Sequence, residues 1–491
     1  MKASELKRVT GRVDFIGPEE NLVEDITQDS RKAGEHTAFL AREGFNTDGH
    51  NFIEDAYRRG CRVFIVEHLP EKTRSDAAYL VVKNPGDKLG RFSCAIHDSP
   101  QEDLSILGVT GTNGKTTTCY IIYDMLNSLG CKTGLIGTIK IDVGDEVFEP
   151  ERTTPEASEI FRYLAAMRDN GCEAAVLEVS SHALALNRVE ELEFTSAIFT
   201  NISQDHLDFH DDMDDYLDAK LSLFRKLSPE GKGFYNRDDE RIAAAFEENF
   251  QDFSPAIYSY SFNNTSDFQA ENLEVDAEKS EFELCGTEYE FPMPGHFNAY
   301  NALSAISLLL ELDYEPENVR AALQSFSGVP GRVERVSGGE NFTVLVDYAH
   351  TPAGIRNVLL SLNRLEVNNI RTVFGCGGDR DRDKRPKMGR EALENSDDVI
   401  ITSDNPRSED PDDIIDDIVS DINFKRYSAS WEIIRERSYA IEKAIERAVS
   451  GDIVVIFGKG HETYQEFSDR KIDFDDREEA RKALQKRGES F

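Results

Sequence analysis

Residues 104–118, with the sequence LSILGVTGTNGKTTT, decide the fold of the chain. The apolar residues 104–109 predict a buried strand, and a helix is expected to begin at Lys115. Gly111 and Gly114 allow backbone N–H groups to turn inward around phosphate oxygens at the helix N-terminus. Lys115 can reach the terminal phosphates, and the Thr116 hydroxyl can bind Mg²⁺. The predicted phosphate-binding loop comprises Gly111, Thr112, Asn113, Gly114, Lys115, Thr116 and Thr117.

This loop departs from the Walker pattern at Val109, where that pattern has glycine. The alternative is a glycine-rich turn that binds no ligand. The Gly-Lys-Thr-Thr run between a strand and an apolar helix argues against that alternative. The expected helix over 117–129 ends at Gly130, and a second strand begins at Gly134, so the stretch predicts a βαβ unit.

Composition narrows the class of protein. The 491 residues carry 93 acidic against 56 basic side chains, a net charge of −37, which argues against nucleic acid and anionic membranes as partners. No apolar run of about eighteen residues predicts a membrane span, and the N-terminal residues lack a signal-peptide pattern. The seven scattered cysteines indicate free thiols in a reducing cytoplasm.

We expect an α/β protein of three domains, since the length suggests about three. Residues 1–98 predict a small α/β domain, and residues 99–329 a central parallel-sheet domain with the phosphate-binding loop. A hinge rich in glycine and proline at 327–332 precedes a doubly wound, Rossmann-like domain over 330–491. The polar clusters follow strands, at the sheet edge where such folds bind ligands.

Several polar residues of the central domain are candidates for metal or substrate binding. Glu178 ends a predicted strand, where a metal-binding acid or a helix-capping acid is expected. Asp205 and His206 follow another strand, and a hard-cation site fits them better than zinc because further ligands with zinc spacing are absent. Thr154 is expected to cap a helix. Composition alone makes Lys220 a surface lysine.

Taken together, these motifs resemble the Mur ligases, the ATP-dependent amino-acid ligases of peptidoglycan precursor synthesis. The resemblance covers nearly the whole chain, and the shorter glycine loop fits this family. The motifs that carry it lie at residues 29–31, 110–117, 153–155, 178–182, 205–206, 298 and 301, 331–332, 347–352, 378–380, 404–407 and 458–462.

The resemblance implies an ATP-dependent amide ligase that uses two Mg²⁺ ions. Thr116 and Glu178 would hold one ion, and Glu178, His206 and Lys220 would serve the second. Because a free ammonium cannot bind a cation, Lys220 would carry a carbamate derived from CO₂, as N6-carboxylysine. Lys115 would complete the catalytic set. The remainder of the nucleotide would be bound by Asn298, Asn301, Arg332 and Asp347.

The resemblance also implies two other substrates. UDP-N-acetylmuramoyl-L-Ala-D-Glu would be bound by Ser30, Asn46, Asp48, His50, Thr153, Thr154, Ser180 and Arg188. meso-Diaminopimelate would be bound by Arg380, Asp404, Asn405, Pro406, Arg407, Gly458 and Glu462. Arg407 is the informative residue, because a guanidinium can clamp the distal carboxylate that lysine lacks. Glu462 would meet the distal ammonium.

Other functions remain possible at this point. L-Lysine could replace diaminopimelate as the amine, and a folylpolyglutamate synthase shares the fold and the loop. An amidating relative of the Mur ligases has a four-cysteine zinc insertion, which this sequence lacks. A P-loop switch or a purely ATP-binding protein would not need Lys220 and three substrate-bearing domains. We expect a cytoplasmic monomer that acts on small molecules.

Overall fold

The computed structural model describes residues 1–488 except residues 12, 45–46, 252, 277, 337–340 and 366. Asn46, one of the expected sugar-nucleotide ligands, lies outside the described residues. The chain forms two compact units. The first comprises Met1–Tyr260, Asn264–Asp267 and Ser304–Tyr314; the second comprises Ser261–Asn263, Phe268–Leu303 and the chain from Glu315 onward.

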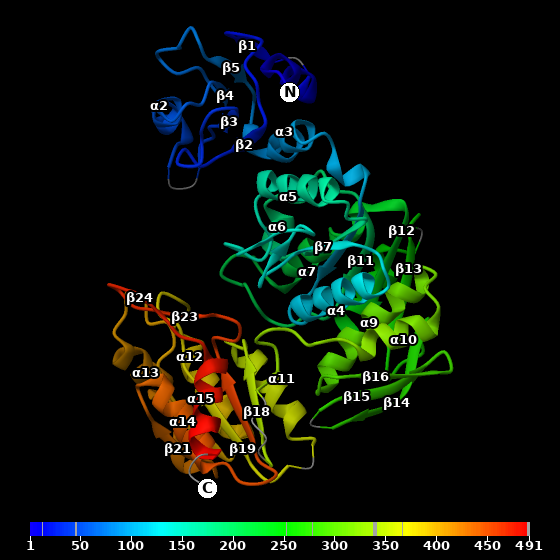
Figure 1. The fold of residues 1–491 in the computed structure, drawn as a ribbon, viewed down its shortest axis with the longest axis vertical. Coiled ribbons are helices and arrows are strands. Elements are labelled where there is room, and N and C mark those ends of the chain that lie inside the picture. Colours follow the sequence, from blue (N-terminus) through cyan, green and yellow to red (C-terminus); the bar gives the residue numbers. More distant parts are fainter. Residues whose placement is uncertain are drawn as a thin grey trace. The chain divides into compact units, whose positions relative to one another are not determined.

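The N-terminal part of the first unit is built on a five-stranded sheet (Figure 1). Its strand order is β1 (Asp14–Ile16), β5 (Ala78–Val81), β4 (Val63–Val66), β3 (Thr37–Leu40) and β2 (Asp25–Thr27). β1 is antiparallel to β5, and the other neighbours are parallel. β4 is buried throughout, as its continuous apolar sequence requires. The helices are α1 (Lys7–Thr10), α2 (Ile53–Arg58) and α3 (Leu89–Ile96).

A parallel sheet forms the centre of the first unit. The strands run in the order β13 (Ala256–Ser261), β12 (Leu227–Asn236), β11 (Phe194–Phe199), β6 (Ser105–Thr110), β10 (Ala174–Glu178) and β7 (Thr133–Ile136). The short strands β8 (Ile141–Asp142) and β9 (Val147–Phe148) continue the sheet in antiparallel pairing. The predicted βαβ unit is confirmed, since β6 leads through α4 (Lys115–Ser128) to β7.

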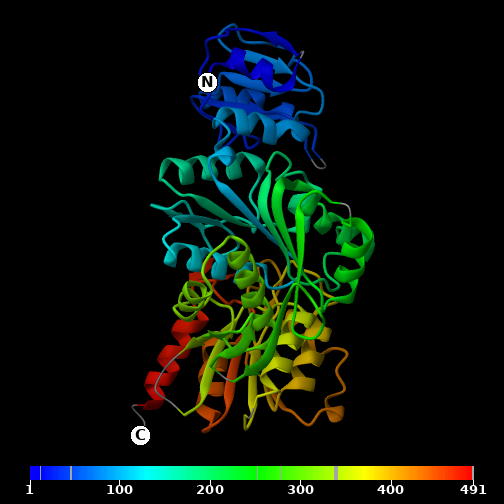
Figure 2. The ribbon, with the colours of Figure 1, turned by 90° about the vertical axis from the view of Figure 1, so that its right-hand side faces the viewer.

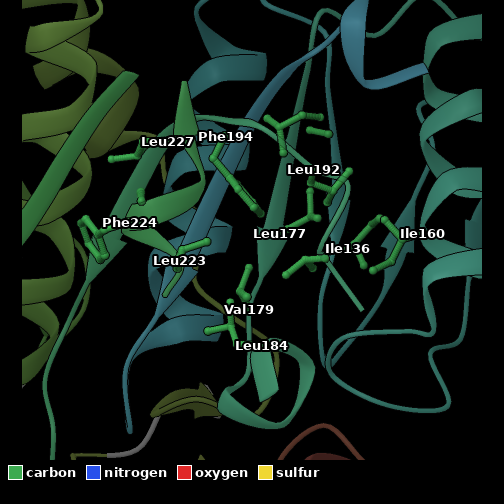
Figure 3. Close-up of a cluster of buried hydrophobic side chains, with 14 of the residues drawn as sticks. Ile136, Ile160, Leu177, Val179, Leu184, Leu192, Phe194, Leu223, Phe224 and Leu227 are labelled. Carbon is green, nitrogen blue, oxygen red and sulfur yellow. The ribbon is translucent and has the colours of Figure 1, made fainter. Parts of the chain in front are cut away.

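Helices cover both faces of this sheet. α4 packs on β7 and β10. An apolar cluster joins strand residues such as Leu177 and Phe194 to Ile160 of α5 (Ala157–Asp169), as Figure 3 shows. The other helices of the unit are α6 (Ser181–Ala185), α7 (Met213–Leu221) and α8 (Glu240–Asn249). Burial of these faces fixes the sheet, so the loops after its strands occupy defined positions.

The second unit contains a six-stranded sheet with helices on both faces (Figure 2). The strand order is β17 (Glu334–Val336), β18 (Thr343–Asp347), β22 (Ile453–Phe457), β19 (Ile370–Phe374), β20 (Asp398–Ile401) and β21 (Ser430–Ile433). Only β17 is antiparallel to its neighbour. One face is covered by α11 (Pro352–Leu362), α12 (Arg385–Asn395) and α13 (Pro411–Val419), the other by α14 (Arg437–Arg447) and α15 (Asp476–Gly488).

Smaller elements complete the second unit. β14 (Phe268–Val275), β15 (Ser280–Leu284) and β16 (Thr287–Phe291) form the antiparallel meander expected from the alternating sequence at 258–292. β23 (Tyr464–Glu466) pairs with β24 (Lys471–Asp473), and α10 (Pro316–Gln324) follows α9. The long helix α9 (His296–Glu311) begins in the second unit and ends in the first.

One local prediction is wrong. Thr154 does not cap a helix, because α5 begins only at Ala157 and its N-cap is Glu156. The Thr154 hydroxyl instead donates to the carbonyl oxygen of Glu178 at 2.7 Å. The hydroxyl of Thr154 therefore bonds to Glu178, 24 residues away in the sequence, and not to a nearby N–H of the helix.

Candidate active site

The phosphate-binding loop follows β6 and leads into α4. Gly111 has a φ of 144°, and a Cβ on it would lie 2.0 Å from Thr200 Oγ1, so only glycine fits. Gly114 is the N-cap of α4, with a φ of 86°. The loop is tied to the segment after β11, because the Thr112 N–H donates to the Asn201 carbonyl at 2.8 Å. The helix N-terminus and Lys115 therefore lie together at the carboxyl end of the sheet.

Two lysines converge on one carbonyl oxygen of this loop. Lys115 Nζ donates to the Gly111 carbonyl at 2.9 Å, and Lys220 Nζ of α7 donates to the same oxygen at 2.8 Å. Lys220 is buried, with 1% of its surface exposed. Burial, together with the charge of Lys115, lowers the pKa of Lys220 well below its usual value. The composition-based expectation of a surface lysine is wrong for this residue.

Glu178 is fully buried at the carboxyl end of β10. Its carboxylate accepts hydrogen bonds from the Thr116 hydroxyl at 3.1 Å and from the Thr138 N–H and hydroxyl, both at 2.9 Å. Gly137 leaves room for it, because a Cβ there would lie 2.5 Å from Glu178 Oε1. The structure thus brings Thr116 and Glu178 together. The sequence analysis did not predict a role for Thr138. Its place shortly after β7, where a hydroxyl side chain can reach a site at the sheet edge, could have suggested one.

Histidines gather beside the two lysines. His206 has a left-handed φ of 54°, and its ring lies edge-on to His182, with the centroids 4.7 Å apart. Burial lowers the pKa of His206, and the charges of Lys115 and Lys220 lower it further. Burial and the two neighbouring histidines hold the pKa of His182 at about 4. These shifts favour the neutral form of both rings, whose nitrogen lone pairs can bind a cation.

The donor set determines whether Mg²⁺ fits here. In the part of the chain that the structure describes, no group of three or more His, Cys, Asp or Glu side chains could hold a metal ion by itself. A buried carboxylate and a hydroxyl nevertheless meet at Glu178 and Thr116, and oxygen donors of this kind suit Mg²⁺ when substrate phosphates complete the shell. The residues present therefore fit a cation that arrives with a nucleotide.

The residues expected to bind the dipeptide lie around Glu178. Thr154 accepts the Ser180 N–H at 3.1 Å, and the Thr153 hydroxyl lies 3.1 Å from the Thr138 hydroxyl, to which it can donate because the Thr138 proton is given to Glu178. Arg188 donates to the Thr154 carbonyl at 3.0 Å. Burial lowers the pKa of Arg188, and its guanidinium also pairs with Glu156 at 3.0 Å. These polar side chains therefore lie next to the Glu178 site, near the carboxyl ends of β10 and β7.

A cavity of about 720 Å³ lies between the N-terminal sheet and α5. Ser30 and Thr47 line it, with several arginines and carboxylates. Asp48 and His50 do not line the cavity. Asp48 instead caps the short helix Gly49–Phe52 by accepting the His50 N–H, and the His50 ring accepts the Glu67 N–H at 3.1 Å.

A second group of expected residues lies at the strand ends of the six-stranded sheet. Asn405 Nδ2 donates to Glu462 Oε2 at 2.8 Å, which joins the loop after β20 to the loop after β22. Arg407, with a φ of 52°, donates to the Gly378 carbonyl at 2.8 Å and pairs with Glu466 at 3.3 Å. Arg380 donates to the Asp379 carbonyl at 3.0 Å.

Close packing at Gly458 and buried charges hold the loops after β20 and β22 in place. Gly458 has a φ of 115°, and a Cβ there would lie 2.3 Å from Asp404 Oδ2. Burial alone would raise the pKa of Asp404, but Lys459 and Arg437 outweigh it, so the pKa lies below its usual value. The sequence analysis missed Lys459 and Arg437, because charged residues are rarely expected to be fully buried.

The residues expected around the base and ribose also belong to the second unit. Asn298 and Asn301 are buried one helical turn apart on α9, and Asn298 donates to the Pro294 carbonyl at 2.8 Å. The Arg332 guanidinium lies 4.8 Å from the centroid of the Tyr348 ring. Asp347 accepts the N–H groups of Val333 and Ala349, both at 2.8 Å, and burial raises its pKa.

Comparisons with known proteins agree with this geometry. The chain matches "Mur ligase family, catalytic domain" at residues 23–95, "Mur ligase middle domain" at 109–309 and "Mur ligase, glutamate ligase domain" at 331–460. It is 41% identical to the UDP-N-acetylmuramoyl-L-alanyl-D-glutamate–2,6-diaminopimelate ligase of Syntrophomonas wolfei, over 95% of this chain and 96% of the relative. The ligase of the same name from Clostridium perfringens is 40% identical over 94% and 95%.

Comparison with solved structures also finds Mur ligases. A structure of a UDP-N-acetylmuramoyl-L-alanyl-D-glutamate–2,6-diaminopimelate ligase aligns with a TM-score of 0.67 and 31% identity, covering 98% of this chain and 99% of that one. The ADP complex of MurF ligase from Thermotoga maritima shares the fold, with a TM-score of 0.63 and 17% identity over 96% and 100% of the two chains. The chain belongs to the Mur ligase family.

Proposed function

We propose that the chain joins meso-diaminopimelate to the D-glutamate carboxylate of UDP-N-acetylmuramoyl-L-Ala-D-Glu, with conversion of ATP to ADP and phosphate. Curated relatives with this activity in their names align over more than nine-tenths of both chains, and the protein is an ATP-dependent ligase of peptidoglycan precursor synthesis. One observation supports the choice of amine: Arg407 lies in the loop after β20, whose Asn405 contacts Glu462 of the loop after β22.

ATP would lie against the phosphate-binding loop. Backbone groups of the loop and Lys115 would bind the phosphates, and Asn298, Asn301, Arg332 and Asp347 would contact the base and ribose. Thr116 and Glu178 would hold one Mg²⁺, and Glu178, His206 and modified Lys220 would serve a second. The ions would neutralise phosphate charge and polarise the transferred phosphoryl group.

Lys220 is proposed to carry a carbamate. Only a neutral amine adds to CO₂, and the burial that lowers the pKa of Lys220 favours the neutral form. Addition of the neutral amine to CO₂ forms a C–N bond and releases one proton, so the product is an anion; starting from the ammonium, two protons are released in all. An anion beside Lys115 would also remove the repulsion between the two ammonium groups.

The chemistry proceeds in two steps on the substrates. An oxygen of the glutamate carboxylate attacks the γ-phosphorus, the bond to the β-phosphate oxygen breaks, and ADP leaves. The amine of diaminopimelate then attacks the acyl phosphate carbon, loses a proton, and expels inorganic phosphate. Lys115 counters the repulsion between the anionic carboxylate and the triphosphate, which would otherwise oppose the first step.

The residues around the amine would select its distal end. The guanidinium of Arg407 can hold a carboxylate bidentately, with Arg380 near it, and Glu462 would meet the ammonium. Asp404, Asn405, Pro406 and Gly458 would shape the pocket. Ser30 and the cavity that it lines would bind the UDP end of the other substrate, and Thr153, Thr154, Ser180 and Arg188 its dipeptide.

A product assay tests this function. Purified protein is incubated with ATP, Mg²⁺, UDP-N-acetylmuramoyl-L-Ala-D-Glu and either meso-diaminopimelate or L-lysine. The mass of the UDP-linked product is then measured by mass spectrometry. We expect the mass of the diaminopimelate adduct. Product with lysine alone would overturn the choice of amine, and a parallel reaction with a folate and glutamate as substrates would reveal the rival ligase by glutamate addition. The monomeric state and the cytoplasmic location stay predictions.

A further inference from the structure

Lys459 is a fully buried lysine that none of the roles above uses. It follows Gly458 at the end of β22, where the chain turns toward Glu462. Its ammonium donates to Asn405 Oδ1 at 3.0 Å and to Glu462 Oε2 at 3.2 Å. A buried ammonium is costly without such partners, so these two hydrogen bonds stabilise the charge of Lys459.

The contacts of Lys459 fix the orientation of the Asn405 amide. An ammonium has only protons to offer, so the atom of Asn405 that faces it must be the carbonyl oxygen. The same oxygen accepts the Glu466 N–H at 3.0 Å. Asn405 Nδ2 is thereby directed to Glu462 Oε2, at 2.8 Å. Lys459, Asn405 and Glu462 form a closed triangle of hydrogen bonds.

Lys459 and Arg407 each have a carboxylate partner in this region. Lys459 neutralises Glu462, and Arg407 pairs with Glu466 at 3.3 Å. The distal end of meso-diaminopimelate carries an ammonium and a carboxylate and adds no net charge. The distal end of lysine carries an ammonium alone, so it would add an unmatched positive charge beside Lys459 and Arg407. In a partly buried site, that difference is much larger than in water.

We propose that Lys459 is a positioning residue that determines amine specificity: by holding and neutralising Glu462, it favours a zwitterionic distal end over a lone ammonium. Lys459 acts through Glu462 and Asn405 and need not touch the substrate. The proposal rests on the proposed function, because it assumes that Glu462 meets the distal ammonium of the amine substrate.

The variant Lys459→Met tests this role, since methionine has an unbranched side chain only one atom shorter and carries no charge. kcat/KM is measured for meso-diaminopimelate and for L-lysine, together with KM for ATP. We expect the preference for diaminopimelate to fall by about tenfold or more, equivalent to about 1.4 kcal/mol. An uncompensated Glu462 attracts a lone ammonium, so kcat/KM for lysine rises. An unchanged preference, or an equal loss for both amines, would overturn the proposal.

Lys471→Met is the matched control. Lys471 lies over the ring of Tyr464, with its Nζ 3.3 Å from the centroid, and Lys459 lies over the same ring at 5.4 Å. Lys471 is exposed and makes neither of the two contacts described. The control should keep the wild-type preference. A control that shifts the preference as far as Lys459→Met would assign the effect to charge near Tyr464 in general and overturn the role of Lys459.

A measurement on the wild-type protein covers the case in which Lys459→Met does not fold. 2-Aminopimelate has the distal carboxylate without the ammonium, so it leaves the Lys459–Glu462 pair intact. It should be a better substrate than lysine, and the reverse order would overturn the proposal. No product with diaminopimelate from the wild type would overturn the proposed function and this inference together, whereas product with an unaltered preference in Lys459→Met overturns the inference alone.

Discussion

Lys220 shows how position changes the chemistry of a single side chain. The residue is buried beside the phosphate-binding loop, and its Nζ shares the Gly111 carbonyl with Lys115. If it carries a carbamate, Lys220→Ala should lower kcat by about 100-fold or more, as loss of a metal-supporting group does. Added short-chain carboxylic acids should restore part of the activity, because they can supply the missing carboxylate.

Two comparisons check this prediction about Lys220. The control Lys226→Ala removes a lysine that pairs with Glu190 at the surface of the same unit, and it should leave kcat unchanged. Failure of every carboxylic acid to restore activity in Lys220→Ala, with the protein folded, would contradict the carbamate.

Arg407 is the residue on which the choice of amine depends most directly. Arg407→Ala should raise KM for diaminopimelate by roughly 10- to 100-fold, because a hydrogen-bonded charge contact is lost. KM for ATP should stay within about twofold, since the nucleotide contacts are elsewhere. Steady-state kinetics with each substrate varied in turn measures both values. Arg470→Ala, at an exposed arginine over Phe467, is the control; equal increases in both KM values for Arg407→Ala would count against the clamp.

At the scale of elements, the turn from β6 into α4 depends on one glycine. Gly111→Ala places a methyl group against Thr200 at a backbone conformation that favours glycine. We expect a loss of about 1–3 kcal/mol of stability and loss of the rise in Tm that ATP produces in the wild type. Gly34→Ala, where nothing lies within 4 Å of the new Cβ, should keep that rise. A normal ATP response in Gly111→Ala would show that the loop tolerates a side chain.

Arg437 joins three elements of the second unit. Its guanidinium pairs with Asp476 of α15 at 2.6 Å and donates to the carbonyl oxygens of Phe457, the last residue of β22, and of Ser403, which follows β20. Arg437→Met should lower the free energy of unfolding by about 3–5 kcal/mol, because Asp476 is left buried and unpaired. Denaturant unfolding measures this loss. Arg481→Met removes an exposed arginine 4.0 Å from Glu334 and should cost less than about 1 kcal/mol; similar losses for both would contradict the role of Arg437.

At the scale of the whole molecule, the strands of the sheets follow from patterns that the sequence displays, whereas their order comes from the structure. Continuous apolar runs such as Val63–Val66 and Ile453–Phe457 predict strands buried on both faces, and both are fully buried. In the described part of the chain, no helix is both long and apolar enough to cross a membrane.

The features that escaped prediction depend on partners distant in the sequence. The sequence predicts a cap at Thr154 because its actual partner, Glu178 at the end of β10, is 24 residues away and gives no local signal. The burial of Lys220 and Lys459 opposes the usual exposure of lysine, and only the packed sheets reveal it. The division of α9 between the two units has no local signal, because the helix pattern continues across it.

The central claim is that the chain activates a glutamate carboxylate as an acyl phosphate and transfers it to diaminopimelate. One reaction tests it: UDP-N-acetylmuramoyl-L-Ala-D-Glu with ¹⁸O in the side-chain carboxylate, ATP, Mg²⁺ and equal amounts of meso-diaminopimelate and L-lysine, with mass analysis of the nucleotide product and the phosphate. The account predicts the diaminopimelate adduct and phosphate that contains one ¹⁸O atom. The lysine adduct, or phosphate without the label, would contradict it.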